Sequence, residues 1–266
     1  MRKLALPFLL VGLTFGLACT TTTPPPAAES AAQPAQPYGM TVEEEARILA
    51  LEDRREYDPE LVAAWVKHEN PLHRLRIALA LGRIGPHTFA DTDGDRELDA
   101  GEAQAGVTEL TTLATDSDRN VREMVAFALG EIADPKSAEA VIRLTGDADF
   151  GVAAEAVEAL SKIGASPRAP KDILTRYLWF TDPKWPDGPR ARALRFLFRF
   201  DSDTASAAAM EALSAPSEGV RQEAAYALAR RKYAPARGPL ELLLTDSNVL
   251  TRAYAAMALG RIAEAP

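Results

Sequence analysis

Six carboxylates fall within the twelve residues of the segment DTDGDRELDAGE, residues 91–102. Acidic residues alternate with other types through its first nine positions, so a chain curling around one point could direct several of them towards it. Hard cations such as Ca²⁺ take about six to eight oxygen ligands, mostly from carboxylates and carbonyls. Calcium binding is therefore the first chemistry that this sequence suggests.

The spacing resembles that of an EF-hand calcium loop, whose ligands stand at positions 1, 3, 5, 7, 9 and 12. Leu98 takes the apolar position 8. Arg96 stands at position 6, where the motif has a glycine for its sharp turn; this departure costs on the order of 1 kcal/mol and predicts weaker binding, not its absence. The ligands that the motif implies are Asp91, Asp93, Asp95, the carbonyl of Glu97, Asp99 and Glu102.

An acidic surface loop is the alternative interpretation of the same residues. In that case Asp99 or Glu102 only favours the start of the next helix through the helix dipole. No second segment of the chain matches the motif, whereas sensor EF-hands usually work in pairs. If the loop binds calcium, a structural clip is therefore expected rather than a switch.

The elements around this loop are predicted to be helices. Of the 266 residues, 47% are hydrophobic and only 7% aromatic, with alanine and leucine dominating the apolar set. That composition favours an all-α protein. The formal net charge of −8 argues against a nucleic-acid binder, because such proteins usually carry a basic surface.

The helical part of the sequence repeats itself. Units such as NVREMVAFALGEIAD (120–134) and LTRAYAAMALGRIAE (250–264) share an A-L-G step, and a period of 31 residues is interrupted by insertions of 17 and 6. The acidic segment lies in the first insertion, and the second is expected in YLWFTDPKWPDGPR. The leucines that align are Leu81, Leu129, Leu160, Leu197, Leu228 and Leu259.

Each unit is predicted to be two antiparallel helices joined by a short polar turn. The apolar positions Val121, Val125, Leu129 and Ile132 fall on one helical stripe. A second apolar segment precedes each unit, as in AGVTELTTLA and GPLELLLT. A pair of this kind buries its apolar stripes only against its neighbours.

Motif, period and pairing together resemble the HEAT-repeat family, specifically the short bacterial units also found in phycobilin lyases, over residues 59–264. The resemblance implies an all-α, right-handed α-solenoid of about six antiparallel helix pairs with an extended concave surface. The arginine typical of the family recurs seven residues before the aligned leucines, and Ala153 interrupts the series. It is expected to contact the next repeat's turn, although a binding ladder is the alternative; the arginines are Arg74, Arg122, Arg190, Arg221 and Arg252.

The first residues resemble a bacterial lipoprotein signal peptide. Residues 1–18 have a basic start and a short apolar run, and Ala18 precedes Cys19, which is the only cysteine. The resemblance implies cleavage before Cys19 and a lipid on it, with the outer membrane favoured because Thr20 is not an aspartate. An ordinary secretory signal with an incidental cysteine is the alternative. Residues 19–40 are predicted to be a Pro/Thr/Ala-rich tether, and residues 41–266 the solenoid.

Two further groups are candidates for contact with a partner. Trp179, Phe180 and Trp185 lie in or near the second insertion, either as interface anchors or as a cover for the local core. Arg192, Arg195 and Arg199 share one helical face, either as a basic patch for an acidic partner or as a solvated surface.

No residue pattern specifies catalysis. A nucleophile elbow, a phosphate loop and a His-Glu-x-x-His motif are all missing from the sequence. The function expected is that of a lipid-anchored, non-catalytic scaffold or adaptor in the bacterial envelope, with another protein as its partner and Ca²⁺ as its ion. The alternative is an enzyme or enzyme accessory similar to the phycobilin lyases.

Overall fold

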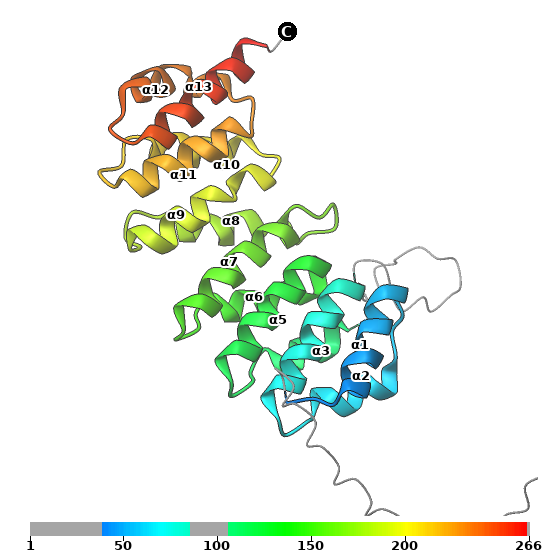
Figure 1. The fold of residues 1–266 in the computed structure, drawn as a ribbon. Helices are drawn as coiled ribbons and strands as arrows, with labels where there is room; N and C mark the ends of the chain where they lie inside the picture. The colour runs from blue at the N-terminus through cyan, green and yellow to red at the C-terminus, as the bar shows by residue number, and fades with distance from the viewer. Residues whose placement is uncertain (1–38, 86–105, 265–266) are drawn as a thin grey trace, which may run out of the picture. The chain divides into compact units, whose positions relative to one another are not determined.

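The computed structural model describes residues 39–85 and 106–264, and within these residues every regular element is a helix (Figure 1). The signal peptide, Cys19, most of the tether and the acidic loop 91–102 lie outside the described residues. The longer helices are α1 (Val42–Arg54), α2 (Pro59–Val66), α3 (Pro71–Ile84), α4 (Val107–Leu113), α5 (Arg119–Ile132), α6 (Ala138–Leu144), α7 (Phe150–Gly164), α8 (Ile173–Leu178), α9 (Asp187–Arg195), α10 (Asp203–Ala212), α11 (Glu218–Ala229), α12 (Arg237–Leu242) and α13 (Val249–Ala263). The short 3₁₀ turns are η2 (Pro135–Ser137), η3 (Trp179–Thr181), η4 (Leu197–Arg199), η5 (Ala234–Ala236) and η6 (Leu243–Thr245).

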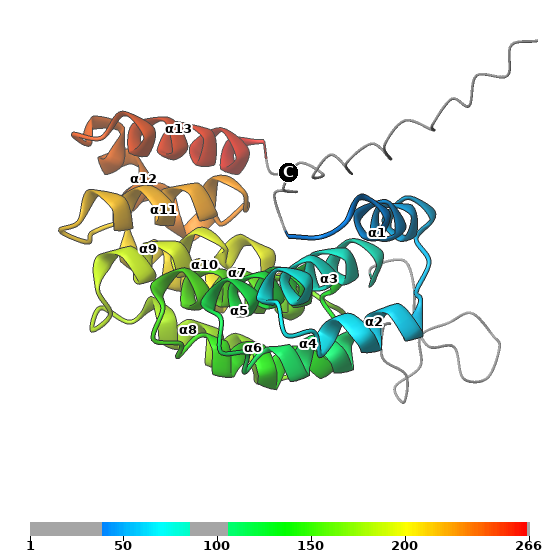
Figure 2. The ribbon, with the colours of Figure 1, turned by 60° about the horizontal axis from the view of Figure 1, so that its bottom comes forward.

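The helices form pairs that stack in chain order, as Figure 2 shows. The described residues contain six such pairs, α2/α3, α4/α5, α6/α7, α8/α9, α10/α11 and α12/α13, with η3 joining α8 to α9. The second helices of successive pairs pack side by side, from α3 to α13. The prediction of an all-α solenoid of about six helix pairs is therefore confirmed.

Short polar side chains start the second helix of several pairs. The Asp118 carboxylate accepts a hydrogen bond from the backbone N–H of Asn120 at 2.7 Å, and Asp149 does the same for Gly151 at 2.9 Å. These bonds satisfy N–H groups that have no partner within the helix. The polar turn that the sequence places between the two helices of a unit thus determines where the second helix begins.

The core follows the predicted stripe. Val121, Val125, Leu129 and Ile132 of α5 are all buried, and so are the apolar residues of the first helices, such as Leu110. Five of the six aligned leucines are buried, whereas Leu259 of α13 is half-buried. The folded part also begins earlier than predicted, because Met40, assigned to the tether, is buried in the core.

Glycines let neighbouring second helices approach closely. A Cβ added at Gly82 would lie 2.8 Å from the Cα of Ala128, and one added at Gly130 would lie 2.9 Å from the Cα of Ala159. Such distances leave no room for a side chain. At Gly260, the equivalent position of α13, an added Cβ would meet nothing within 4 Å in the described residues.

Helix α1 packs against α3 at the N-terminal end of the stacked pairs. Arg76 of α3 is buried and forms ion pairs with Glu45 and Glu52 of α1. Glu52 also pairs with Arg83 at 2.8 Å. Helix α1 therefore packs through ionic contacts as well as through apolar residues such as Ile48.

The six extra residues of the second insertion are divided between two places. Asp147 follows Leu129 by 18 residues, whereas Asp182 follows Leu160 by 22, so four extra residues belong to the first part of this unit, up to the turn. The turn between η3 and α9 contains the other two. The prediction that YLWFTDPKWPDGPR contains the whole insertion is wrong, because leucine-to-leucine spacing gives only the total.

Candidate interaction groove

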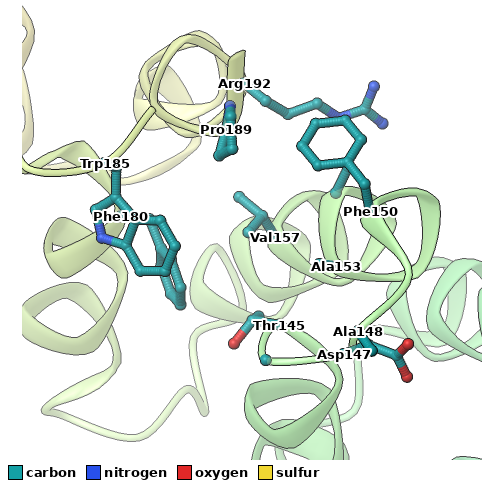
Figure 3. Close-up of a pocket in the computed structure, with 12 residues that line it drawn as sticks. Thr145, Asp147, Ala148, Phe150, Ala153, Val157, Phe180, Trp185, Pro189 and Arg192 are labelled. Atoms are coloured by element: carbon teal, nitrogen blue, oxygen red, sulfur yellow. The ribbon is translucent and has the colours of Figure 1, made fainter. Parts of the chain in front are cut away.

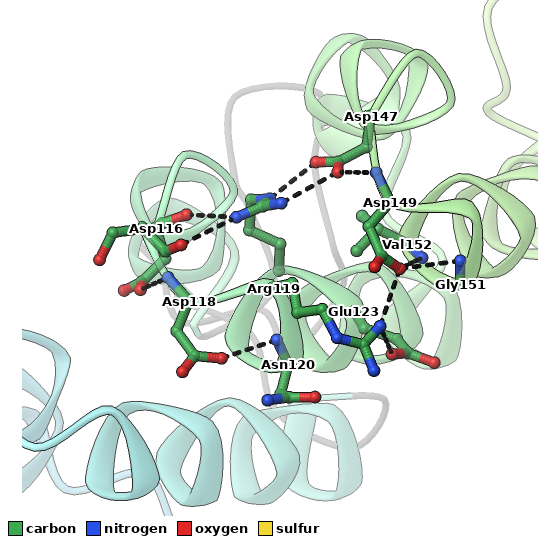
Figure 4. Close-up of polar contacts among 11 residues, drawn as sticks. Asp116, Asp118, Arg119, Asn120, Glu123, Asp147, Asp149, Gly151 and Val152 are labelled. Atoms are coloured by element: carbon green, nitrogen blue, oxygen red, sulfur yellow. Dashed lines mark hydrogen bonds and ion pairs between the residues drawn. The ribbon is translucent and has the colours of Figure 1, made fainter.

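Three of the recurring arginines each join one repeat to the next. Arg122 donates hydrogen bonds from Nε and Nη2 to the two carboxylate oxygens of Asp147 at 2.7 and 3.0 Å. Its Nη1 donates to the backbone carbonyl of Asp116 in its own turn at 2.8 Å. Figure 4 labels Asp116 and Asp147, the two residues that this arginine joins. The same arrangement joins Arg74 to Asp116 and Arg221 to Asp246. We call each such arrangement a clamp, and for these three arginines it confirms the predicted contact with the neighbouring turn.

The clamps keep the aspartates ionised. Hydrogen bonds from Arg122 are the main cause that lowers the pKa of Asp147, and Arg221 acts likewise on Asp246. At Asp116 burial is the largest influence and raises the pKa, but the hydrogen bonds from Arg74 and the backbone of Asp118 outweigh it. The pKa of each of the three carboxyls is therefore below its usual value.

The series of clamps is interrupted around α7 and α9. Ala153 occupies the arginine position of α7, and Asp182, the turn aspartate of the next unit, forms no ion pair with an arginine among the residues that the structure describes. Asp182 still accepts a hydrogen bond from the backbone N–H of Lys184, as the clamped aspartates do from their own turns. Among the described residues, Arg190 of α9 donates to the carbonyl of Thr181 and to no aspartate, because Ala215 stands where the following turn would have one.

A groove lies where the clamp is missing. Its deeper part is a cavity of about 300 Å³ between the turn that precedes α7 and the segment from η3 to α9. Phe150 and Val157 line one side, and Phe180 and Trp185 face them across it (Figure 3). An adjoining hollow of about 550 Å³ continues along Trp179 and Arg176.

The structure brings the three predicted aromatic residues together and gives them different surroundings. The rings of Trp179 and Trp185 are 4.6 Å apart between centroids, and those of Phe180 and Trp185 are 5.8 Å apart. Phe180 is buried, Trp185 is half-buried against the core, and Trp179 is 59% exposed. Phe180 and Trp185 therefore cover the local core, whereas Trp179 of the same cluster is available at the surface.

The three predicted arginines share a surface, but carboxylates of adjacent helices pair with them. Arg192 lies 3.1 Å from Glu158, Arg195 lies 2.8 Å from Glu223, and Arg199 lies 3.6 Å from Glu158. The guanidinium of Arg195 also stacks on a tyrosine ring, with 4.4 Å between its Cζ and the ring centroid. Within the described residues, the surface of these arginines carries charges of both signs.

One of the carboxyls next to this surface has an altered pKa. Burial raises the pKa of Glu155, and the nearby charge of Glu158 raises it further, while Arg192 opposes both. The ion pairs at this junction thus include a carboxylate in a partly dehydrated setting.

Two residues of the groove were not predicted from the sequence as contact residues. Phe150 is 61% exposed at the start of α7, and Ala153 lines the cavity one turn later. The interruption of the arginine series at Ala153 was visible in the sequence and marked this location. What it could not indicate is the space that the missing side chain leaves.

Residues 39–85 and 106–264 contain no cluster of three or more His, Cys, Asp or Glu side chains suited to a metal ion. His68 and His73 stack with 3.8 Å between their ring centroids. Across these residues every helix is too short or too polar to span a membrane.

Comparisons with known proteins agree with the repeat architecture. A family model described as HEAT repeats matches residues 107–186 and 180–260. The fold is similar to that of an archaeal HEAT-like repeats protein from Thermococcus onnurineus NA1, with 17% identity, a TM-score of 0.52, and coverage of 84% of this chain and 93% of that one. No curated protein matches the chain, and the interpretation as a relative of the phycobilin lyases gains no support.

Two designed proteins are also similar in structure. One is an engineered protein with 21% identity and a TM-score of 0.45, where 85% of this chain covers 65% of the other. The other is a designed armadillo repeat protein in complex with the peptide (KR)4, with 17% identity, a TM-score of 0.47, and coverage of 77% and 98%.

Proposed function

Because the chain belongs to the HEAT-repeat family, we propose that it is a non-catalytic scaffold or adaptor that binds another protein. The groove between α7 and α9 is its contact surface. The observation that carries this proposal is the exposure of Phe150 and Trp179 beside the junction of α7 and α9. From α3 to α9, this is the one junction at which alanine, Ala153, replaces the recurring arginine. Large aromatic side chains at an open groove are typical anchors of protein interfaces.

The groove has the composition expected of an interface rather than of an active site. Apolar and aromatic side chains form most of its lining, while the charged Arg192 at its rim is paired with glutamates. A partner that covers Trp179 and Phe150 would bury aromatic surface at a small cost in side-chain entropy. The many charged pairs around the groove would form a polar rim.

We also propose that the protein is anchored in the bacterial envelope by a lipid on Cys19, with the outer membrane favoured. The support is the sequence of residues 1–19. The proline-rich residues that follow would act as a tether between the lipid and the repeats. In this arrangement the membrane is contacted through the anchor alone, and nucleic acid is not a partner.

Calcium binding at residues 91–102 is the third part of the proposal. The six oxygen ligands implied by the EF-hand resemblance are its support, and Arg96 is expected to weaken the affinity. The segment connects the first helix pair to the second, so a bound ion would stiffen one connection of the array.

Photo-crosslinking tests the proposed contact surface. A photo-reactive benzoyl-phenylalanine is placed at Phe150, and a matched one at Leu242, which is 78% exposed on α12. We expect one discrete protein adduct from position 150 in cell envelopes, and its loss in the double variant Trp179→Ala/Trp185→Ala. Equal adducts from both positions, or an adduct that persists in the double variant, would remove the groove from the proposal.

The anchor and the ion have separate tests. Cys19→Ser is expected to release the protein from membranes into the soluble fraction, and retention would contradict the lipid anchor. Calcium at millimolar concentration should raise the melting temperature of the wild type but not of Asp91→Asn/Glu102→Gln. A calorimetric titration without heat and without a melting shift would exclude the calcium site.

A further inference from the structure

We infer that the groove contains a socket for an arginine side chain of the partner, at the place where Ala153 interrupts the chain's own arginine series. The inference rests on the proposed function, because it specifies the chemistry of the partner that the groove binds.

Each clamping arginine donates from Nη1 to the two backbone carbonyls that precede it by six and five residues. For Arg122 these are the carbonyls of Asp116 and Ser117, at 2.8 and 3.3 Å. Arg252 repeats the pattern with Asp246 and Ser247 at 2.7 and 3.0 Å, although no described turn follows it. The carbonyl pair is therefore a guanidinium acceptor that recurs with the turn. Arg74 and Arg221 bind the same pair in their own units.

At the interrupted position the acceptors are present and the donor is missing. The equivalent carbonyls belong to Asp147 and Ala148, and no hydrogen-bond donor among the described residues reaches either of them. Both residues line the 300 Å³ cavity together with Ala153. The cavity therefore includes the location that the arginine side chain occupies in the clamped repeats.

The opposite wall suits a planar cation. In a clamp the second partner of the guanidinium is the aspartate of the next turn, but Asp182 lines a neighbouring hollow instead of the cavity. Trp185, three residues later, faces the cavity in its place (Figure 3). The face of an indole ring attracts a guanidinium. The chain makes such contacts itself, with Arg195 over Tyr226 at 4.4 Å.

The one cation in the lining does not oppose this occupant. Arg192 contributes its stem to the cavity, and its guanidinium lies beside Phe150, on the side away from Trp185 (Figure 3). Its charge is matched by Glu155 and Glu158 at 3.4 and 3.1 Å. The net charge of −8 further favours a cationic partner.

Arginine fits this site better than lysine. Two carbonyls from successive residues accept hydrogen bonds from one guanidinium nitrogen while the flat group remains free to stack. An ammonium group can donate to the carbonyls but has no plane to lay against Trp185.

The test uses the whole chain and two short glycine–serine peptides that differ only in a central arginine or citrulline, its neutral isostere. Binding is followed by the NMR signal of the Trp185 indole N–H. We expect the arginine peptide to bind about tenfold more tightly than the citrulline peptide, a difference of about 1.4 kcal/mol. Equal affinities would overturn the inference.

A substitution that fills the socket provides the matched test. In Ala153→Arg, the new guanidinium is expected to donate to the carbonyls of Asp147 and Ala148 and to raise the melting temperature by about 2 °C. It should also weaken binding of the arginine peptide about tenfold. Ala165→Arg, which adds the same charge at the exposed end of α7, should change neither. Ala153→Met fills the space without a charge and serves if the arginine variant does not fold. Unchanged peptide affinity in folded Ala153→Arg or Ala153→Met would contradict the socket.

The two proposals can fail separately. If position 150 crosslinks a partner whose affinity does not change when its contacting arginine becomes citrulline, the socket is wrong and the proposed function stands. If the arginine peptide binds but no partner is crosslinked, the socket stands and the proposed function is wrong.

Discussion

Two adjacent junctions of this molecule use the same repeat in different ways. Between α5 and α7, Arg122 clamps Asp147, and Gly130 allows the backbone to approach Ala159. Between α7 and α9, Ala153 replaces the arginine and Ser161 stands at the glycine position. Helices α7 and α9 accordingly pack against each other less extensively than α5 and α7 do.

Other contacts stabilise the second junction. Arg192 and Arg199 of the fourth unit both lie within 4 Å of Glu158 on α7. Gly164, at the end of α7, lies against the ring of Phe200, where an added Cβ would be 2.3 Å from Cε1. A clamp can therefore be lost locally when ion pairs elsewhere hold the helices, and the space that it leaves becomes a groove.

Acid should have the largest effect, because it acts on all three clamps together. The folded-state pKa of Asp116, Asp147 and Asp246 is lowered, so their stabilisation is complete above the unfolded value of about 3.9 and is lost as pH falls through the folded values. Each pKa unit of lowering corresponds to about 1.4 kcal/mol. Urea unfolding between about pH 5 and pH 2 measures the loss.

The control for acid is the triple variant of these aspartates to asparagine. It should be less stable at neutral pH and lose less stability on acidification than the wild type. If the free energy of unfolding falls by the same amount in both proteins on acidification, the clamps do not cause the loss of stability in acid.

Removing one clamp should come next in size. Arg122→Ala leaves a nearly buried Asp147 carboxylate without its cation and is expected to cost about 2–3 kcal/mol. Arg190→Ala removes one hydrogen bond to the Thr181 carbonyl and should cost about 1 kcal/mol. Denaturant melts of the two variants compare a clamped with an unclamped arginine. Similar losses would mean that the clamps add nothing to the stability of the junction.

Adding a methyl group where α5 and α7 approach closely should have a smaller effect on stability. Gly130→Ala places a Cβ 2.9 Å from Ala159 and is expected to destabilise the protein by about 1–2 kcal/mol. Gly260→Ala meets nothing within 4 Å and should stabilise α13 by up to about 1 kcal/mol through helix propensity. Thermal melts of the pair should therefore move in opposite directions, and a shift in the same direction would argue against close packing at Gly130.

The sequence was sufficient for the features that repeat. The helix pairs, the buried stripe from Val121 to Ile132 and the contact of Arg122 with the next turn all follow from a side-chain pattern with a period of 31. Periodic positions have the same neighbours in every unit, so one unit predicts the others.

The features that break the repeat were harder to predict. Spacing between leucines gave the size of the second insertion but not its division between two places. The pairing of Arg192 with Glu155 and Glu158, 37 and 34 residues earlier, joins neighbouring units, and a single helix face does not reveal it. The cavity beside Ala153 depends on the turn that faces it, so the missing arginine alone could not indicate its size.

The smallest effect is expected for Asp182→Asn. The carboxylate makes no ion pair with any residue that the structure describes, and asparagine can still accept the hydrogen bond from the N–H of Lys184 through Oδ1. Stability should therefore change by no more than about 0.5 kcal/mol. Asp147→Asn, the matched change at the clamped junction, should cost at least about 1 kcal/mol because Arg122 loses its charged partner. If the two variants lose stability equally in urea melts, then a cation clamps Asp182 as well, and the difference between the two junctions does not arise from the arginine series.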